Sequence, residues 1–340
     1  MDEDLDVPLR RKVIALVYNL KKNIASAAVD AEAELDSIET VQALTRVFES
    51  KGLTVLPLEA DMHFSERIAA AAVDLVFNIA EGIHGRGREA QIPAILDMLD
   101  IPYVGSDATA LGLSLDKAMT KRMVASYHIK TPHAVLACPN EPLHLGGLSF
   151  PLIVKPNAEG SGKGIGENSV VRDRKQLEAL LAHSFALYHE PMLIESYIAG
   201  REFTVGVLGN GENLRVFEPM EIEFLKPTQD SYTVYSYKVK QEYQHFVRYH
   251  CPAEISATVR ETLLRDAKRV FRCLGCQDFA RVDFRVAEDG TVYFIEINPL
   301  PGLAPQYSDY PMLAAFCGVS YDALIYEILL AGAKRLGLSL

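Results

Sequence analysis

Two strand-like segments joined by an Asp-Gly pair constrain the fold of this chain more than any other feature of its 340 residues. The first segment runs from Arg281 to Val286 and the second from Val292 to Asn298, and polar and apolar side chains alternate along both. An Asp-Gly pair between alternating segments is a strong signal for a two-residue β-hairpin turn. We therefore expect an antiparallel hairpin with Asp289 and Gly290 as its turn.

The predicted hairpin determines which side chains share a face. Counting back from the turn places Asp283 opposite Glu296, and Arg281 opposite Asn298. Because side chains alternate between the two faces of a strand, these four residues share one polar face. The other face is apolar and carries Val282, Phe284, Ile295 and Ile297. We expect the apolar face in the core and the polar face at a site of chemistry.

The two facing carboxylates, Asp283 and Glu296, repel each other unless a positive charge compensates them. A divalent cation supplies such a charge, and oxygen ligands of this kind suit Mg²⁺, which usually keeps waters and shares nucleotide phosphates. The alternative is a solvated polar face on which Arg281 and Arg285 neutralise the acids. The sequence predicts a metal site here and leaves the arginine alternative open.

A glycine-rich segment runs from Lys155 to Gly166. Glycines let backbone N–H groups approach phosphate oxygens closely, and lysines add positive charge. The segment is not a Walker A loop, because a glycine follows Lys163 and because a strand, Ser169–Val171, comes next instead of a helix. A strand, a glycine loop and a second strand predict a hairpin lid over a nucleotide triphosphate. A plain mobile hairpin is the alternative.

Lys155 lies at the end of the otherwise apolar segment Leu152–Lys155. A lysine inside such a strand needs a partner, because burying an unpaired charge is costly. We predict that the partner is a phosphate group.

The first third of the chain alternates short apolar runs with helical spacing. The runs cover residues 13–19, 53–59, 74–80 and 102–105. This order predicts a parallel βαβ sheet of the Rossmann type. Asp36 with Glu39 resembles a helix-capping pair at the start of the first helix. The loop 81–89 is either a substrate loop at the strand ends or a solvated surface loop.

The pattern changes after this first third. Helical spacing covers 106–127, a connection rich in Pro and Gly covers 132–147, and strands then follow in pairs, one of them over 215–222. Helices are expected near 174–187 and 257–274, which makes this part α+β. We predict three domains: an N-terminal α/β domain over 1–112, a central domain with the glycine-rich flap over 113–198, and a C-terminal domain with the metal site over 199–340.

Charge and composition exclude several classes of protein. The net charge of −11, with no cluster of Lys and Arg, argues against nucleic acid as a partner. No apolar run approaches the roughly 20 residues of a membrane span, and the acidic start from Met1 to Pro8 is unlike a signal sequence. An odd number of cysteines, five, fits reduced thiols. We expect a cytoplasmic protein with no membrane partner.

Several short motifs occur in a specific order. They are Ile101-Pro-Tyr-Val-Gly-Ser106, Asp116-Lys117, Lys155-Pro with Glu159-Gly-Ser161, Leu193-Ile-Glu-Ser-Tyr-Ile198 with Glu202-Phe-Thr204, Arg281-Val-Asp283, and Glu296-Ile-Asn298 with Pro301-Gly302. From about Asp74 to the C-terminus, this order resembles the D-alanine:D-alanine ligase family of ATP-grasp enzymes. The resemblance implies an ATP-grasp fold behind a Rossmann-like N-terminal domain, and an ADP-forming ligase that joins two amino-acid-like substrates through an acyl phosphate.

The resemblance also implies roles for individual residues toward ATP and metal. Lys117 and Lys155 would contact the phosphates, Glu202 the ribose, and Ser161 would lie in the flap over the phosphates. The adenine would be held largely by backbone groups of Glu195, Ser196, Tyr197 and Ile198. Two Mg²⁺ ions, or Mn²⁺ in their place, would be bound by Asp283, Glu296 and Asn298.

For the reaction itself, the resemblance implies that Arg281 and the backbone N–H of Gly302 form an oxyanion site and that Lys240 lies in a loop that closes over the substrates. Glu32 would meet a substrate amine and His84 a substrate carboxylate. Tyr307 stands where the family has a serine for the second substrate. The family also implies a homodimer.

The chain departs from the family pattern on the substrate side. The N-terminal loop lacks the usual glycine-rich start, the segment Arg88–Gln91 diverges, and Gln241 and Tyr307 replace a tyrosine and a serine. Two alternatives therefore stay open. One is a ligase for a different amino acid, a peptide or a natural-product precursor, and the other is an ATP-binding protein without ligase activity.

Overall fold

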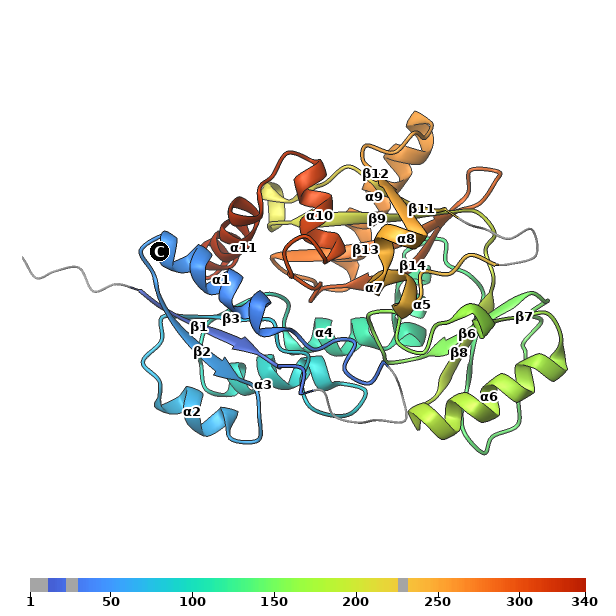
Figure 1. Cartoon of the computed structure of the whole chain (residues 1–340), viewed down its shortest axis with the longest axis horizontal. Coiled ribbons are helices and arrows are strands. Elements are labelled where there is room, and N and C mark those ends of the chain that lie inside the picture. Colours follow the sequence, from blue (N-terminus) through green and yellow to red (C-terminus); the bar gives the residue numbers. More distant parts are fainter. Residues whose placement is uncertain (1–11, 23–29, 226–231) are drawn as a thin grey trace, which may run out of the picture.

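Three β-sheets follow one another along the chain in a computed structural model that describes residues 12–22, 30–225 and 232–340 (Figure 1). The acidic N-terminus, from which we argued against a signal sequence, lies outside the described residues. The strands of the three sheets fall within 13–104, 134–196 and 201–298. The predicted domain limits at 112/113 and 198/199 stay a prediction.

The N-terminal sheet is parallel throughout, as predicted, with the strand order β2-β1-β3-β4. Its strands are β1 (Val13–Tyr18), β2 (Thr54–Glu59), β3 (Leu75–Asn78) and β4 (Tyr103–Val104). Helices cover both faces, which explains the continuous apolar strands. They are α1 (Ile38–Ser50) and α11 (Tyr321–Arg335) on one face, and α2 (Phe64–Ala70) and α3 (Gln91–Met98) on the other (Figure 1).

Two helix boundaries differ from the prediction. The N-cap of α1 is Ser37, whose hydroxyl accepts from the Thr40 N–H at 3.4 Å, so Asp36 is not the cap. The helical stretch over 106–127 is broken at Asp116 into α4 (Ala108–Leu115) and α5 (Lys117–Ser126). Asp116 causes the break by accepting from the Met119 N–H at 3.0 Å, which starts a new helix.

The central sheet is antiparallel, with the order β5-β8-β6-β7. Its members are β5 (Ala134–Ala137), β6 (Leu152–Pro156), β7 (Val170–Val171) and β8 (Met192–Ser196), and α6 (Arg174–Tyr188) covers one face. The β6–β7 pair is the predicted flap hairpin, with Leu152 opposite Val171. Strand β5 was wrongly predicted as part of a connection. It is a four-residue edge strand, and such strands carry little periodicity.

The C-terminal sheet has the order β12-β11-β9-β13-β14, with β10 beside β9. Its strands are β9 (Arg201–Leu208), β10 (Arg215–Val216), β11 (Met220–Phe224), β12 (Val247–His250), β13 (Phe279–Val286) and β14 (Val292–Asn298). Helix α9 (Ala257–Cys273) packs against one face. The single strand expected over 215–222 is in fact two, because the register against the same edge of β9 shifts by one residue between Val216 and Met220 and interrupts the pairing.

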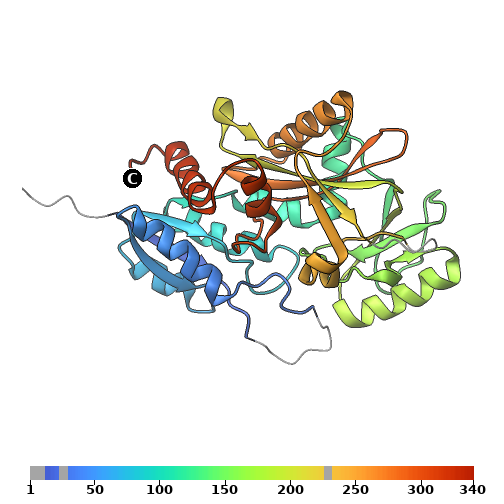
Figure 2. The same ribbon diagram turned by 45° about the horizontal axis from the view of Figure 1, so that its top comes forward.

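Helix α10 (Asp309–Phe316) packs very closely on strand β9. A Cβ atom on Gly206 would lie 2.6 Å from Leu313 Cδ2 and 3.0 Å from Tyr310 Cε2, so glycine is required for this contact. Figure 2 shows α10 over the sheet, beside α11. The close approach brings the start of α10 to the polar face of β13.

Within the described residues, no single helix is long and apolar enough to cross a bilayer. Helices α10 and α11 reach that length and apolarity only as a pair, with a bend of 108° between them. Both contribute fully buried side chains to the core, including Leu313, Ile325 and Leu329.

Candidate active site

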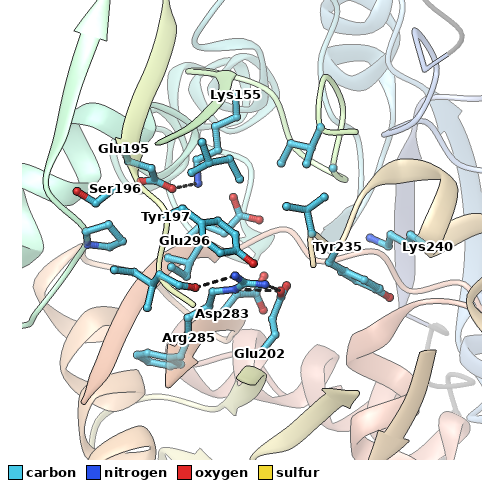
Figure 3. A pocket seen from close by; sticks show the side chains of 18 of the residues that line it. Lys155, Glu195, Ser196, Tyr197, Glu202, Tyr235, Lys240, Asp283, Arg285 and Glu296 are labelled. Carbon is cyan, nitrogen blue, oxygen red and sulfur yellow. Dashed lines mark hydrogen bonds and ion pairs between the residues drawn. The ribbon is translucent and has the colours of Figure 1, made fainter. Parts of the chain in front are cut away.

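A cavity lies between the central and C-terminal sheets and encloses about 820 Å³, counting the part open to solvent. Strands β6 and β8 line it from one side, and β13 and β14 line it from the other (Figure 3). Eleven of the residues singled out from the sequence line it: Lys155, Ser161, Glu195, Ser196, Tyr197, Ile198, Glu202, Lys240, Arg281, Asp283 and Glu296. Segments far apart in sequence therefore meet here as predicted.

The acid pair lies on one face, as predicted from the hairpin. Asp283 pairs with Glu296 and Arg281 with Asn298, although the turn itself was predicted wrongly. The loop has three residues, closed by a hydrogen bond from the Ala287 N–H to the Thr291 carbonyl at 2.9 Å. A bulge between Asp283 and Phe284 then restores the register.

The bulge changes which side chains of β14 reach the core. Phe294 is fully buried beside Phe284, with ring centroids 6.3 Å apart. Ile295, which we predicted on the core face, lines the cavity next to Glu296 instead. The extra residue in β14 shifts the alternation by one position, which is the expected effect of a bulge.

The acid pair carries an incomplete set of partners. Arg281 Nη2 donates to Asp283 Oδ2 at 2.9 Å, whereas Asp283 Oδ1 is buried and has no hydrogen-bond partner among the described residues. Burial and the nearby Glu296 raise the pKa of Asp283 to about 7. Lys117, Lys155 and Arg281 outweigh burial at Glu296 and lower its pKa. Arg285 does not neutralise this pair, because it binds Glu202 at 3.1 Å.

The oxygen donors fit a divalent cation only in part. Asp283 and Glu296 supply carboxylates, while the side-chain oxygen of Asn298 accepts from the Leu300 N–H at 3.0 Å. Within the described part of the chain, no group of three His, Cys, Asp or Glu side chains could hold a metal. A cation bound here would therefore need water or phosphate oxygens as further ligands, which is typical of Mg²⁺.

Lys155 has a carboxylate partner within the protein, so its burial does not by itself indicate a phosphate, and its contact with a phosphate stays a prediction. Its ammonium lies 2.7 Å from Glu195 Oε1, and Lys121 lies 2.8 Å from Glu195 Oε2 (Figure 3). Strands β6 and β8 bring the two residues together, since Ile153 pairs with Glu195 across the sheet. Burial alone would raise the pKa of Glu195, but the two lysines lower it to about 2.

The segment from Glu195 to Ile198 forms hydrogen bonds mainly within the protein. The Ser196 and Tyr197 N–H groups donate to the carbonyls of His133 and Pro151 at 2.9 and 3.2 Å. The Ile198 carbonyl accepts from Arg285 Nη1 at 2.8 Å. The role of this segment and of Glu202 toward a nucleotide stays a prediction.

The glycine-rich flap is held closed by carboxylates of the N-terminal domain. The Gly164 N–H donates to Asp30 Oδ2 at 2.7 Å, and the Gly160 N–H donates to Glu34. Glu34 also accepts from Arg88 Nη2 at 2.6 Å. Ser161 has a φ of 51°, a left-handed conformation at the tip of the flap. Lys117, from α5, donates to the carbonyl of Glu159 and lies 3.6 Å from Glu296.

A short helix, α7 (Tyr237–Gln241), closes another side of the cavity and carries Lys240. Burial lowers the pKa of the Lys240 ammonium, which lies 3.9 Å from Asp309 Oδ2. Arg281 is bound to the same carboxylate, with Nη1 at 2.5 Å from Asp309 Oδ2. The lysine and arginine predicted to act on the substrates therefore share one counterion.

The residues predicted to bind substrate lie in two further cavities. Glu32 and His84 line one of about 1950 Å³, and Tyr307 and Gly302 line another of about 1080 Å³ that also includes Asn298, both counted with the part open to solvent. The second of these cavities shares Ser161 and Lys240 with the cavity of the acid pair, and the roles predicted for the four residues stay predictions.

Four functional candidates escaped the sequence analysis: Glu34, Arg88, Lys121 and Asp309. Each of them contacts a residue distant in sequence, which no local pattern predicts. Asp309 alone had a local signal, because it is a charged residue directly before the apolar stretch at the start of α10.

Comparisons with known proteins agree on one family. The family described as "D-ala D-ala ligase C-terminus" matches residues 141–330. A D-alanine–D-alanine ligase of Syntrophotalea carbinolica is 33% identical over 312 residues, covering 92% of this chain and 95% of that protein. The structure of a Bacillus anthracis D-alanine–D-alanine ligase complexed with ATP has a TM-score of 0.76 and 22% identity, covering 96% of this chain and 98% of that one. The VanG D-Ala:D-Ser ligase of Enterococcus faecalis has a TM-score of 0.72 and 20% identity, covering 95% of this chain and all of that one.

Proposed function

The chain belongs to the D-alanine–D-alanine ligase family, and from this premise we propose that it is an ATP-dependent ligase of the ATP-grasp type. It joins the carboxylate of one amino-acid-like substrate to the amine of a second, and it converts ATP to ADP and phosphate. The same membership supports a homodimer that acts in the cytoplasm.

One observation supports this function most strongly. The paired carboxylates Asp283 and Glu296, the cation Arg281 and the lysine Lys155 line a single cavity, and the glycine-rich flap contributes Ser161 to its wall. A binding protein without chemistry would need the lysine and the flap but not the arginine beside the acid pair. The combination suits a reaction in which negative charge develops next to a bound phosphate.

Lys117 and Lys155, which both lower the pKa of Glu296, provide the positive charge for the phosphates of ATP. Glu202 and the backbone from Glu195 to Ile198 bind the nucleoside end. One or two Mg²⁺ or Mn²⁺ ions, bound by Asp283, Glu296 and Asn298, would neutralise the phosphate oxygens. The buried, unpartnered Oδ1 of Asp283 supports this assignment.

In the first step, a carboxylate oxygen of the first substrate attacks the γ-phosphoryl group of ATP. The bond between the β,γ-bridging oxygen and the γ-phosphorus breaks, so that an acyl phosphate and ADP result. The lysines stabilise the charge that spreads over the phosphoryl oxygens. The closed flap excludes water, which would otherwise hydrolyse the acyl phosphate.

In the second step, the amine of the second substrate attacks the acyl carbon. Arg281 and the Gly302 N–H stabilise the oxyanion that develops, and phosphate leaves with the electron pair of the broken C–O bond. The amine loses a proton as the C–N bond forms. Lys240, held above the cavity by α7, adds positive charge near the phosphate that leaves.

The identity of the second substrate is a separate question, because Tyr307 replaces the small residue expected there. A tyrosine fills space and moves its hydroxyl outward. It lines the cavity of about 1080 Å³ that also contains Gly302. This favours an acceptor other than D-alanine, as the Enterococcus faecalis protein with a similar fold is a D-Ala:D-Ser ligase.

The test is to incubate the protein with ATP, Mg²⁺ and separate pools of D- and L-amino acids, and to measure ADP and the masses of new products. We expect ADP formation that depends on an added amino acid, together with a product whose mass equals two substrates less one water. Release of AMP and pyrophosphate, or no dependence on amino acids in any pool, would contradict the proposed reaction.

A further inference from the structure

Asp309 is a fully buried carboxylate with three donors from three different segments. It accepts from Arg281 Nη1 on β13 at 2.5 Å, from the Tyr235 hydroxyl at 2.9 Å and from the Tyr249 hydroxyl on β12 at 3.2 Å. The side chain is 0% exposed. Such a charge is retained in a core only when its partners are well placed.

The local structure places Asp309 with little freedom. It is the first residue of α10, where the helix dipole stabilises a negative charge. The absence of a side chain at Gly206 lets α10 approach β9, and Arg281 lies directly opposite Gly206 on β13. The carboxylate therefore meets the guanidinium because of backbone packing and not because a flexible side chain reaches across.

The carboxylate also connects Arg281 to the segment that closes the cavity. Tyr235 lies just before α7, which carries Lys240 (Figure 3). The Lys240 ammonium is 3.9 Å from the same carboxylate. The Tyr235 and Tyr249 hydroxyls are themselves 2.7 Å apart. One side chain therefore joins the oxyanion arginine to the helix that carries the lysine.

The other contacts of Arg281 leave it dependent on Asp309. Its Nη2 binds Asp283, one of the acids that we assign to the metal, and its Nε is buried with no acceptor among the described residues. Within the described residues, Asp309 is thus the one hydrogen-bond partner of the guanidinium that has no assigned role toward the nucleotide or metal.

We propose that Asp309 is a positioning residue that fixes the orientation of Arg281 and holds α7, with Lys240, in the closed position over the active site. The kinetic part of this proposal rests on the proposed ligase function, whereas the part concerning α7 does not. Asp309 itself does not touch the reacting atoms.

A purely structural role is the competing explanation, and the chain offers a matched control for it. Asp278 is also 0% exposed and also pairs with an arginine, Arg335, at 2.8 Å. That pair lies outside the three cavities that contain the proposed site residues. Asp278→Asn therefore removes an equally buried carboxylate without changing the site.

Hydrogen exchange tests the attachment of α7 without any need for activity. In Asp309→Asn, we expect the amides of residues 238–242 to exchange roughly 10-fold faster or more, because a charge-assisted hydrogen bond to the preceding segment is weakened. Asp278→Asn should leave their exchange unchanged. Equal exchange of these amides in Asp309→Asn and the wild type would overturn this part of the proposal, and so would equal acceleration in the two variants.

A double-mutant cycle tests the orientation of Arg281. We expect Asp309→Asn to lower kcat by roughly 10- to 100-fold, with KM for ATP changed less than about threefold, because the lost interaction is to a charged group that acts after ATP binds. In an Arg281→Ala background, the same substitution should have almost no further effect on kcat. Independent, multiplying effects would overturn the proposal.

The result for the wild type separates the two hypotheses. A wild-type protein that forms no product refutes the proposed function, and the exchange measurement still decides whether Asp309 holds α7. An active wild type with an equally active Asp309→Asn variant refutes the positioning role alone. Tyr235→Phe, which keeps the ion pair, provides a second variant if Asp309→Asn does not fold, and it should accelerate exchange in α7 as well.

Discussion

Replacing Glu195 with glutamine should destabilise the protein more than any comparable change of a surface ion pair. Glu195 lies between Lys121 and Lys155 at 2.8 and 2.7 Å, and the side chains of all three are 3–5% exposed. Removing the carboxylate takes the closest counterion from two buried ammonium groups. Breaking a buried ion pair in this way costs about 3–5 kcal/mol of unfolding free energy.

The pKa of Glu195 leads to a similar magnitude. It falls from 4.5 to about 2 on folding, and a difference of this size corresponds to about 3 kcal/mol. Because the folded-state pKa is the lower one, this contribution is fully present above pH 4.5 and is lost as the pH falls through 2. At pH 7 the whole effect should therefore be measurable.

The matched control is Glu178→Gln. Glu178 also pairs with its partner, Arg174, at 2.7 Å, but both side chains are more than half exposed. Urea titrations at pH 7 should show a loss of about 3–5 kcal/mol for Glu195→Gln and less than about 1 kcal/mol for the control. Similar losses in the two variants would refute the argument, since only burial distinguishes the two pairs.

Three further predictions concern the flap and a second buried acid. Glu34→Gln weakens the hydrogen bonds from Arg88 and from the flap, so limited proteolysis within 157–166 should accelerate by roughly 10-fold. An unchanged rate of proteolysis would show that these hydrogen bonds do not hold the flap. Gly162→Ala should lower kcat, because the added Cβ would lie 2.9 Å from a backbone nitrogen of α7 and the residue has a φ of 72°. Gly166→Ala is the control and should not lower kcat, because the space around Gly166 is open. Equal activity of the two variants would contradict the closed flap. Burial raises the pKa of Glu190 from 4.5 to about 7, so stability falls as the pH rises from 4.5 and levels off above 7. Glu190→Gln should therefore be about 3 kcal/mol more stable than the wild type at pH 8 and nearly equal to it at pH 4.5, as urea titrations can check.

The parallel sheet could be predicted from continuous apolar runs separated by helical spacing, and the polar face of the hairpin from the alternation of polar and apolar residues. Even so, the hairpin prediction succeeded through two compensating errors. Gly290, with a φ of 81°, closes a three-residue loop, and a bulge after Asp283 then restores the pairing with Glu296. Neither the longer loop nor the bulge changes the order of polar and apolar residues along the sequence, so the alternation alone could not predict either of them.

The partners of the site residues could not be predicted, because they come from distant segments. Arg281 and Asp309 are 28 residues apart in sequence, and Gly160 and Glu34 are 126 apart. The partner of Lys155 illustrates the limit most clearly. The need for a counterion followed from an isolated lysine in an apolar strand, but its identity depended on how β6 and β8 pair.

The most direct test of the account is to follow a heavy oxygen isotope from the carboxylate of the first substrate. If that carboxylate attacks the γ-phosphoryl group, one labelled oxygen per turnover must appear in the released inorganic phosphate, as measured by mass spectrometry. Asp283→Asn should abolish this transfer together with ADP formation, whereas Asp278→Asn should retain both. Product formation with no label in phosphate, or with the label in AMP, would contradict the proposed chemistry of this site.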